Sequence, residues 1–327
     1  MLYGCRCFHE HPAERSFVNN FESSALSKKV LKYRIVRHAN HPNHHDLLLL
    51  HGFLGSGRQF DHLIPGLCNV INPVTLDISM ACPSSNNSVK QPGHSTGFPD
   101  DRSVHTETFH MSTLKTQNLV SALQTVINKY LEPDPILLGY SMGGRLALSW
   151  AIQYPDQTAG LILESTTAGI EDPDQRKERR QMDKKRAEHI RNDFPAFLKE
   201  WEANALFLKA DGETDSSNHV TPPLEELRNI QANNDPETAA SWLIDFGTGT
   251  MPSHWKFLHK ILVPVLVITG GYDRKFCEIG GNLNRSIPHS QHVIAPGAAH
   301  RVHIDKPDWY LSQILSFLEN TGIAPAK

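Results

Sequence analysis

Short apolar runs alternate with polar stretches along the chain, and their spacing predicts strands that alternate with helices. Residues 46–50, 135–138 and 160–164 are apolar almost throughout, as strands are when both faces of a parallel sheet are buried. Two further runs of this kind, 264–270 and 291–294, come late in the chain. The pattern favours an α/β fold with a mostly parallel central sheet flanked by helices.

In other segments the apolar positions recur with the spacing that is typical of half-buried strands and helices. Residues 29–36 alternate between apolar and polar side chains and predict a first strand, and residues 70–78 predict another. Residues 60–67 predict a short helix. A longer helix is expected after Ser112 or Thr113, because the apolar side chains that follow fall on one stripe. That stripe consists of Leu119, Leu123, Val126, Ile127 and Tyr130.

Two stretches interrupt this alternation. Residues 79–91 are rich in Ser, Asn and Pro, which predicts a loop. Residues 170–254 are largely helical in pattern and charged, and they lie between two predicted strands, so we expect a helical cap over the active site. The core would then comprise residues 29–169 and 255–327. Residues 1–28 are polar without periodicity and predict a mobile extension.

The sequence GYSMG at 139–143 carries the strongest chemical signal. It follows an expected strand and precedes the helical stretch 144–151, which is the strand–turn–helix context of a G-x-S-x-G nucleophile elbow. The tight turn lifts the Ser141 hydroxyl above the edge of the sheet, and the flanking glycines leave room for it. We favour a catalytic Ser141 over a glycine-rich helix start without chemistry.

Two more elements fall where an elbow predicts them. The strand 46–50 ends in His51-Gly52-Phe53, so the backbone N–H groups of Phe53 and Met142 are expected to form an oxyanion hole. Late strands lead to Asp273 and then to His300. The chain order of serine, aspartate and histidine is that of an α/β-hydrolase triad.

In such a triad His300 would take the serine proton, and Asp273 would hold the imidazole in the correct tautomer. The chain has 19 histidines, so a single one carries little information. His300 is distinguished by its place after a late strand, and His303 is its nearest rival.

The composition limits the classes of binding partner and the cellular compartment that we expect. The chain has 327 residues, and its formal charge of −3 implies neither a nucleic-acid nor a membrane partner. No apolar run is long enough to span a membrane, and no secretory signal precedes the first strand. The five cysteines are scattered and odd in number, which favours a reduced, cytoplasmic setting.

Two clusters raise the question of a metal ion. Cys5 and Cys7 have no second pair, so we interpret them as part of the mobile terminus. Four histidines crowd the turn after the first strand, where we favour a solvated hairpin loop over a metal site. They are His38, His41, His44 and His45. We therefore predict neither a metal nor a cofactor.

Together these motifs resemble the 2-succinyl-6-hydroxy-2,4-cyclohexadiene-1-carboxylate (SHCHC) synthase family of menaquinone and phylloquinone biosynthesis, which has the α/β-hydrolase fold. The resemblance covers about residues 45–320. It rests on motifs outside the serine itself: GYSMGGR at 139–145, LES at 163–165, QRKERR at 175–180, Asp183, Phe197, Trp201, Phe207, FGTG at 246–249, Trp255, GYDRKF at 271–276, and His300 with His303.

The resemblance implies a lyase that eliminates pyruvate from a cyclohexene carrying succinyl, enolpyruvyl and carboxylate groups. The triad serine would act as a base, and the substrate would be a small polyanion. The resemblance also implies that four residues line the substrate pocket: Tyr140, Arg145, Arg179 and Trp201. Independently, Arg145 lies one helical turn after Ser141 and therefore starts on the same face.

The chain departs from the family pattern at several positions. Gln231 stands where the family tends to have arginine, and Arg228, one helical turn earlier, is a candidate to supply that charge. Residues 79–91 are inserted before the Pro-Gly-His stretch, in which Ser95 replaces a glycine. Ala299 replaces the glycine that precedes the triad histidine.

Two other functions fit parts of the sequence. An ordinary serine hydrolase, either an esterase or a carbon–carbon bond hydrolase, fits the triad equally well, although the cap arginines and the Gly-Thr-Gly stretch favour the lyase. A non-catalytic binding protein of the same fold would usually lack a triad member. The sequence leaves the oligomeric state open.

Overall fold

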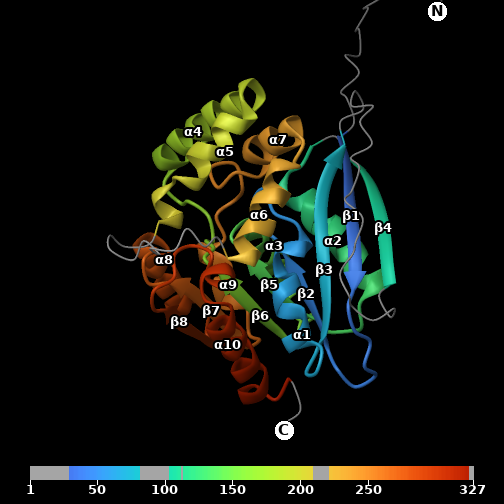
Figure 1. The fold of residues 1–327 in the computed structure, drawn as a ribbon. Helices are drawn as coiled ribbons and strands as arrows, with labels where there is room; N and C mark the ends of the chain where they lie inside the picture. Colours follow the sequence, from blue (N-terminus) through green and yellow to red (C-terminus); the bar gives the residue numbers. More distant parts are fainter. Residues whose placement is uncertain (1–28, 82–102, 112, 209–220, 324–327) are drawn as a thin grey trace, which may run out of the picture.

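A computed structural model of the chain describes residues 29–81, 103–111, 113–208 and 221–323. Its centre is an eight-stranded sheet with the strand order β4-β1-β3-β2-β5-β6-β7-β8 (Figure 1). The strands are β1 (Lys29–Arg37), β2 (Asp46–Leu50), β3 (Asn72–Ala81), β4 (Ser103–Met111), β5 (Ile136–Tyr140), β6 (Gly160–Glu164), β7 (Val265–Gly270) and β8 (Ser290–Ala295).

Six of these strands run parallel, from β3 through β2 and β5 to β8, and β1 pairs antiparallel with both β3 and β4. Strands β2, β5 and β6 are buried throughout, as their unbroken apolar sequences predict. The predicted fold class, a mostly parallel sheet flanked by helices, is therefore confirmed.

The helices cover both faces of the sheet and also fill the segment between β6 and β7. The α-helices are α1 (Ile64–Leu67), α2 (Thr116–Tyr130), α3 (Met142–Gln153), α4 (Pro173–Asn192), α5 (Phe194–Glu202), α6 (Pro222–Ala232), α7 (Pro236–Phe246), α8 (Arg274–Ser286), α9 (Val302–Asp305) and α10 (Pro307–Asn320). Three short 3-10 helices are η1 (Gly57–Leu63), η2 (Ala205–Phe207) and η3 (Trp255–Lys260).

Alternate side chains of the strands point into two separate cores. Leu48 and Leu50 pack with α2, α3 and α8 on one face, whereas Leu47 and Leu49 pack with α1, α9 and α10 on the other. The predicted stripe on α2 lies in the first of these cores. The sheet is thus held from both sides, and the ends of its strands are rigid positions for functional side chains.

Helices α4 to α7 form a layer beyond the ends of the strands (Figure 1). With Leu54 from the turn after β2, they form a small separate core, whose other members are Ala187, Ile190, Phe194, Phe197, Ala239, Ala240 and Leu243. Salt bridges join this layer to the rest of the chain, including Arg58–Glu226 and Arg301–Glu202. We call residues 170–254 the helical layer; its role as a cap remains a prediction.

Some details of the predicted elements are wrong. Strand β4 was missed, because it is an edge strand whose outward side chains are mostly polar. Residues 79–81 belong to β3 and not to a loop; the rest of the predicted loop lies outside the described residues. The predicted helix at 60–67 is a 3-10 turn followed by one turn of α1.

The histidine-rich turn after β1 is not a hairpin loop. Strand β1 pairs with β3 and β4, and β2 lies on the far side of β3, so the turn crosses over one strand. His38 contacts the Thr75 hydroxyl at 3.0 Å, and the rings of His41 and His44 lie 5.1 Å apart. The described residues contain no group of three or more His, Cys, Asp or Glu arranged to hold a metal ion.

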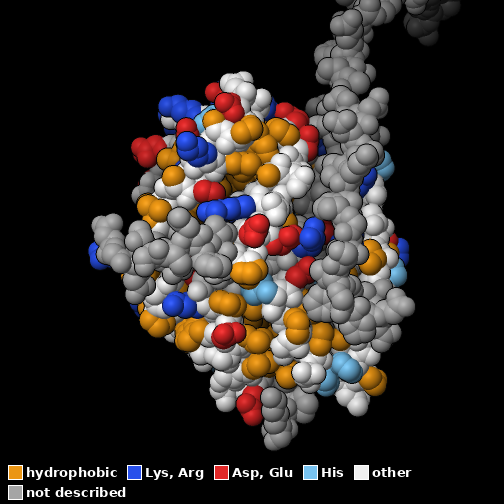
Figure 2. All heavy atoms as spheres, viewed as in Figure 1, with side chains coloured by type: hydrophobic (Ala, Val, Ile, Leu, Met, Phe, Trp, Pro, Cys, Tyr) orange, Lys and Arg blue, Asp and Glu red, His pale blue; other side chains and the backbone are white. Residues whose placement is uncertain are grey.

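Acidic, basic and hydrophobic side chains are interspersed over the face shown in Figure 2. Among the helices that the structure describes, none is long and apolar enough to cross a membrane. The predicted mobile extension, including Cys5 and Cys7, lies outside the described residues.

Candidate active site

Ser141 lies in the sharp turn between β5 and α3. Its backbone has φ 49° and ψ −104°, a conformation that is strained for a residue with a side chain. Hydrogen bonds fix this turn: the Ser141 N–H donates to the Glu164 carbonyl at 2.9 Å, and the Thr166 hydroxyl donates to the Ser141 carbonyl at 2.7 Å. The strain is thus stabilised by the neighbouring strand β6.

The glycines of the elbow are required by close backbone contacts. A Cβ on Gly143 would lie 2.2 Å from the Leu50 carbonyl oxygen, and a Cβ on Gly139 would lie 2.5 Å from the Cα of Gly144. Helix α3 therefore starts in direct contact with β2 and β5, which a larger residue would prevent.

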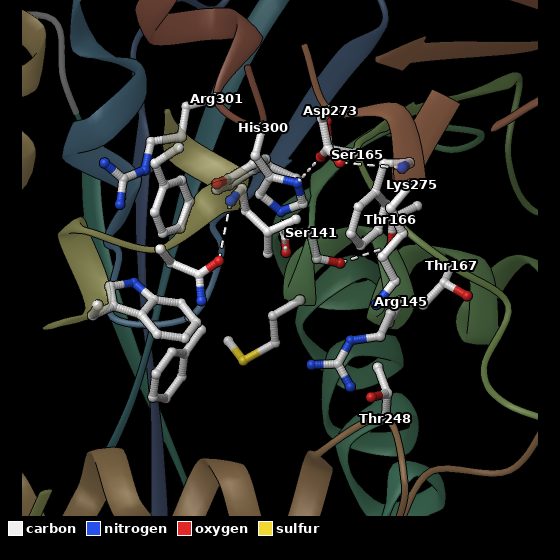
Figure 3. Close-up of a pocket in the computed structure, with 18 of the residues that line it drawn as sticks. Ser141, Arg145, Ser165, Thr166, Thr167, Thr248, Asp273, Lys275, His300 and Arg301 are labelled. Atoms are coloured by element: carbon white, nitrogen blue, oxygen red, sulfur yellow. Dashed lines mark hydrogen bonds and ion pairs between the residues drawn. The ribbon is translucent and has the colours of Figure 1, made fainter. Parts of the chain in front are cut away.

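The structure brings the three predicted triad residues together (Figure 3). His300 Nε2 lies 3.2 Å from Ser141 Oγ, and His300 Nδ1 lies 2.6 Å from Asp273 Oδ2. The other oxygen of Asp273 accepts a hydrogen bond from the Phe276 N–H at 3.2 Å, at the start of α8. The backbone N–H of His300 donates to the Leu206 carbonyl. This is the connectivity that proton transfer from serine through histidine requires.

The two predicted oxyanion donors lie next to this group. Met142 is the first residue of α3, so its N–H has no acceptor within the helix and lies at the positive end of the helix dipole. Phe53 follows β2 in a tight turn that is closed by a hydrogen bond from the Gly55 N–H to the Gly52 carbonyl. Phe53, Ser141 and Met142 all line the same cavity.

That cavity has a volume of about 610 Å³ and lies between the strand ends and the helical layer. Its wall contains the triad and all of the predicted substrate-binding residues, which are Tyr140, Arg145, Arg179 and Trp201. It also contains polar groups that the sequence analysis did not single out for binding: Gln59, Ser165, Thr248, Lys275 and Arg301.

Arg145 is nearly fully buried in the cavity wall. Its Nη1 donates to the Phe246 carbonyl, and its guanidinium lies 4.7 Å from the centre of the Phe246 ring. Burial and the nearby charge of Arg179 lower the pKa of Arg145 from its ordinary value. A cation held in this way is stabilised by an anion in the cavity.

Arg179 lies on α4 beside a buried acid. Its Nε is 2.9 Å from Asp183 Oδ1, and Asp183 is also 3.9 Å from Arg186. Burial and the charge of Arg179 lower the pKa of both Arg186 and Lys275, which line the same cavity. The described cavity wall therefore contains more cations than acids, which fits a small ligand with several negative charges.

Aromatic side chains form the opposite wall. The Trp201 ring makes edge-to-face contacts with Phe53 at 5.4 Å and with Phe207 at 5.6 Å. The Tyr140 ring lies 5.6 Å from the His300 ring and is buried. These rings give the cavity an apolar wall.

The structure also places the residue that departs from the family pattern. Gln231 is buried on α6 and lines the cavity. Arg228, the suggested replacement for the missing charge, does not line it; its Nε lies 3.8 Å from Glu202. That suggestion is wrong, because the Arg228 side chain pairs with Glu202 and is not part of the cavity wall.

The hydroxyls of Ser165 and Thr248 are buried, line the cavity, and have no hydrogen-bond partner among the described residues. A ligand that satisfies them would gain affinity. The LES and FGTG motifs contain both positions, but a motif alone does not indicate which hydroxyl is unpaired.

A second histidine–carboxylate pair lies behind the first. His303, the rival of His300, contacts both oxygens of Glu164 at 2.8 and 2.9 Å, and neither residue is exposed. Gln59 contacts the other ring nitrogen of His303 at 3.2 Å and separates it from the cavity. No hydrogen bond joins His303 to Ser141, whereas His300 Nε2 lies 3.2 Å from Ser141 Oγ, so of the two histidines His300 has the geometry of the predicted triad.

The fold and this geometry define an α/β-hydrolase with a complete Ser-His-Asp arrangement. The family model described as alpha/beta hydrolase fold matches residues 47–307, and the chain belongs to that family. Within it, the chain belongs to the SHCHC synthase family.

The similarity to that family extends over most of the chain. A Bacillus subtilis (strain 168) protein provisionally named SHCHC synthase is 35% identical over 204 residues, which is 62% of this chain and 72% of that protein. A SHCHC synthase of Yersinia pestis (strain Pestoides F) is 25% identical over 89% of this chain and 95% of its own length. The structure of MenH from S. aureus has a TM-score of 0.73 and 27% identity, covering 89% of this chain and 99% of that one.

Proposed function

We propose that this protein is a SHCHC synthase, a lyase of menaquinone or phylloquinone biosynthesis. It eliminates pyruvate from 2-succinyl-5-enolpyruvyl-6-hydroxy-3-cyclohexene-1-carboxylate. The observation that carries the proposal is the arrangement of Arg145 and Arg179 around a complete Ser141–His300–Asp273 group in one cavity. A polyanionic substrate needs such cations, whereas a neutral ester does not.

The reaction needs a base and a site for negative charge, and no water. The ring carbon next to the succinyl carbonyl loses its proton through Ser141 to His300, and the electron pair forms an enolate. The N–H groups of Phe53 and Met142 stabilise the enolate oxygen. The carbonyl then re-forms, a double bond forms between ring carbons C2 and C3, and the existing ring double bond moves to C4 and C5. The bond between C5 and the enolpyruvyl oxygen breaks in the same step. The released enolate of pyruvate takes up the proton.

Asp273 supports this step through its contact with His300. It keeps Nδ1 of the imidazole protonated, so that Nε2 can accept the proton from Ser141, and it stabilises the imidazolium that results. Tyr140 and Trp201 form the wall against which the ring of the substrate packs, and Arg145 and Arg179 bind its carboxylates. A cytoplasmic location and the absence of a macromolecular partner remain predictions from the sequence.

The direct test is incubation of the purified protein with the cyclohexene substrate. Pyruvate, followed with a coupled dehydrogenase, and the absorbance of the conjugated ring product should appear together and in equal amounts. A Ser141→Ala variant is the control for the uncatalysed elimination. Ester hydrolysis with no pyruvate would instead identify the serine hydrolase that the same triad geometry supports.

A further inference from the structure

One buried cation in the cavity wall has no role in the function described so far. Arg301 directly follows His300, its side chain is almost fully buried, and it lines the same cavity as Ser141. In Figure 3, Arg301 and Arg145 lie on opposite sides of Ser141. The cavity therefore has a positive group on the side away from Arg145 and Lys275.

Arg301 is held in a fixed orientation. Its Nη1 lies 3.0 Å from Oε2 of Glu202 and its Nη2 lies 2.5 Å from Oε1, so the pair is bidentate. The guanidinium lies 3.7 Å from the centre of the Phe207 ring. A planar fork that is stacked and bonded at two points loses little further freedom when it binds a second carboxylate.

Arg301 still has donors available. A guanidinium carries five N–H groups. Two of them point to Glu202, and Arg301 also interacts electrostatically with the buried Tyr140 hydroxyl. The neighbouring turn of α6 contributes Gln231 to the cavity, and its amide is uncharged. On this wall the described residues provide two cations for an anionic group: Arg301, and Arg186, whose guanidinium lies 5.9 Å from the centre of the Trp201 ring. Arg301 is the more deeply buried of the two.

We propose that Arg301 binds a carboxylate of the substrate, so that the polyanion is held from both sides of Ser141. This inference rests on the proposed function for the identity of the substrate. Arg145 and Arg179 bind one end of the molecule, and Arg301 binds a carboxylate on the side of Phe207 and Trp201. The reacting carbon then lies between them, over the Ser141 hydroxyl.

Substitutions of Glu202 can distinguish a ligand-binding role of Arg301 from a purely structural role. If Arg301 only ties α5 to the core, losing either partner of the Arg301–Glu202 pair has the same effect. If Arg301 binds the ligand, Glu202 competes with the ligand carboxylate for the guanidinium. Removing Arg301 and removing the charge of Glu202 then have different effects on affinity.

The test is isothermal titration of the full-length protein with 2-succinylbenzoate, an aromatic ring that carries one carboxylate and one succinyl group. Arg301→Gln should weaken binding about tenfold or more, as expected for loss of a charge-assisted contact. Arg191→Gln is the matched control, because Arg191 makes a similar bidentate pair with Glu237 and does not line the cavity. It should bind with unchanged affinity.

Glu202→Gln should bind 2-succinylbenzoate at least as tightly as the unmodified protein. If Arg301→Gln fails to fold, Arg301→Lys, which keeps the charge and loses the fork, should weaken binding by a smaller factor. The proposal is overturned if Arg301→Gln has unchanged affinity, or if Glu202→Gln weakens binding as much as Arg301→Gln does. Because no turnover is needed, this result is independent of whether pyruvate is released.

Discussion

Among the described residues, two buried histidine–carboxylate pairs differ in their access to the cavity. We call His300 with Asp273 the open pair and His303 with Glu164 the closed pair. The two histidines are three residues apart, and the Tyr140 ring contacts both, at 5.6 Å from His300 and 4.7 Å from His303. The open pair reaches Ser141, whereas the closed pair is separated from the cavity by Gln59.

The difference shows that a buried histidine–carboxylate pair can take part in catalysis only where its surroundings connect it to the cavity. In the closed pair the carboxylate also accepts a hydrogen bond from the backbone N–H of His303, so Glu164 fixes the start of α9. The same residue holds the elbow through its carbonyl, which accepts from the Ser141 N–H. We therefore expect the open pair to determine activity and the closed pair to determine stability.

The largest expected effect is on catalysis by the open pair. Ser141→Ala and His300→Ala should each lower kcat by about four orders of magnitude or more, and the double variant should lose little more, because the residues act as a unit. Stability should change by only about 1 kcal/mol, because water from the cavity can fill the space. Steady-state kinetics of the three variants check this, and independent, additive losses would contradict a shared proton transfer.

The closed pair should show the opposite behaviour. Glu164→Ala or His303→Ala leaves an uncompensated buried group and should lower the free energy of unfolding by about 3–5 kcal/mol. Urea denaturation measures this loss, with His300→Ala as the matched variant from the open pair. The comparison between the pairs would fail if His303→Ala abolished turnover in protein that is still fully folded.

The pH dependence of stability should reveal the closed pair through His62, which contacts the His303 carbonyl at 2.7 Å. Burial and the charge of His303 lower the pKa of His62 to about 4. The unfolded chain takes up this proton near pH 6.5, so between pH 6.5 and 4 the unfolded state binds more protons than the folded state. Stability should fall as the pH is lowered through this window.

The loss attributable to His62 should be on the order of 3 kcal/mol. It is measured as the difference between the unmodified protein and His62→Gln in urea denaturation at pH 7 and pH 4. A His62→Gln variant that loses as much stability as the unmodified protein would show that His62 does not contribute.

The smallest of these effects concerns the cations beside the open pair. Arg145→Lys and Arg179→Lys keep the charge but lose the planar fork, so each should lower kcat/KM about tenfold. This corresponds to a loss of about 1.4 kcal/mol of transition-state stabilisation. Lys177→Gln, an exposed charge on α4, is the control and should have normal kinetics. Normal kinetics of Arg179→Lys would show that the substrate does not use the planar fork of Arg179.

The sequence was sufficient to predict those elements whose structure depends on a local sequence pattern. The apolar strands and the elbow at Ser141 could be predicted, because burial on both faces and a glycine-flanked turn leave a local pattern. Strand β4 could not, since an edge strand needs few apolar residues. The hairpin expected after β1 was wrong because strand pairing is decided by contacts that are distant in sequence.

The candidate site shows the same limit. Ser141, Asp273 and His300 follow from chain order and motif, and the structure brings them together. The position of Arg301 could not be predicted, because its orientation depends on Glu202 and Phe207 from the helical layer. Arg228 was a candidate from its spacing to Gln231, but a spacing does not fix the direction of a side chain, and Arg228 pairs with Glu202.

The central claim is that Ser141 transfers a proton and does not form a covalent intermediate. Intact-protein mass spectrometry of samples quenched during a single turnover of the cyclohexene substrate tests it most directly. We predict that the mass stays that of the unmodified chain, 36.7 kDa, while pyruvate is released. An added mass equal to an acyl fragment of the substrate, absent in Ser141→Ala, would contradict the claim.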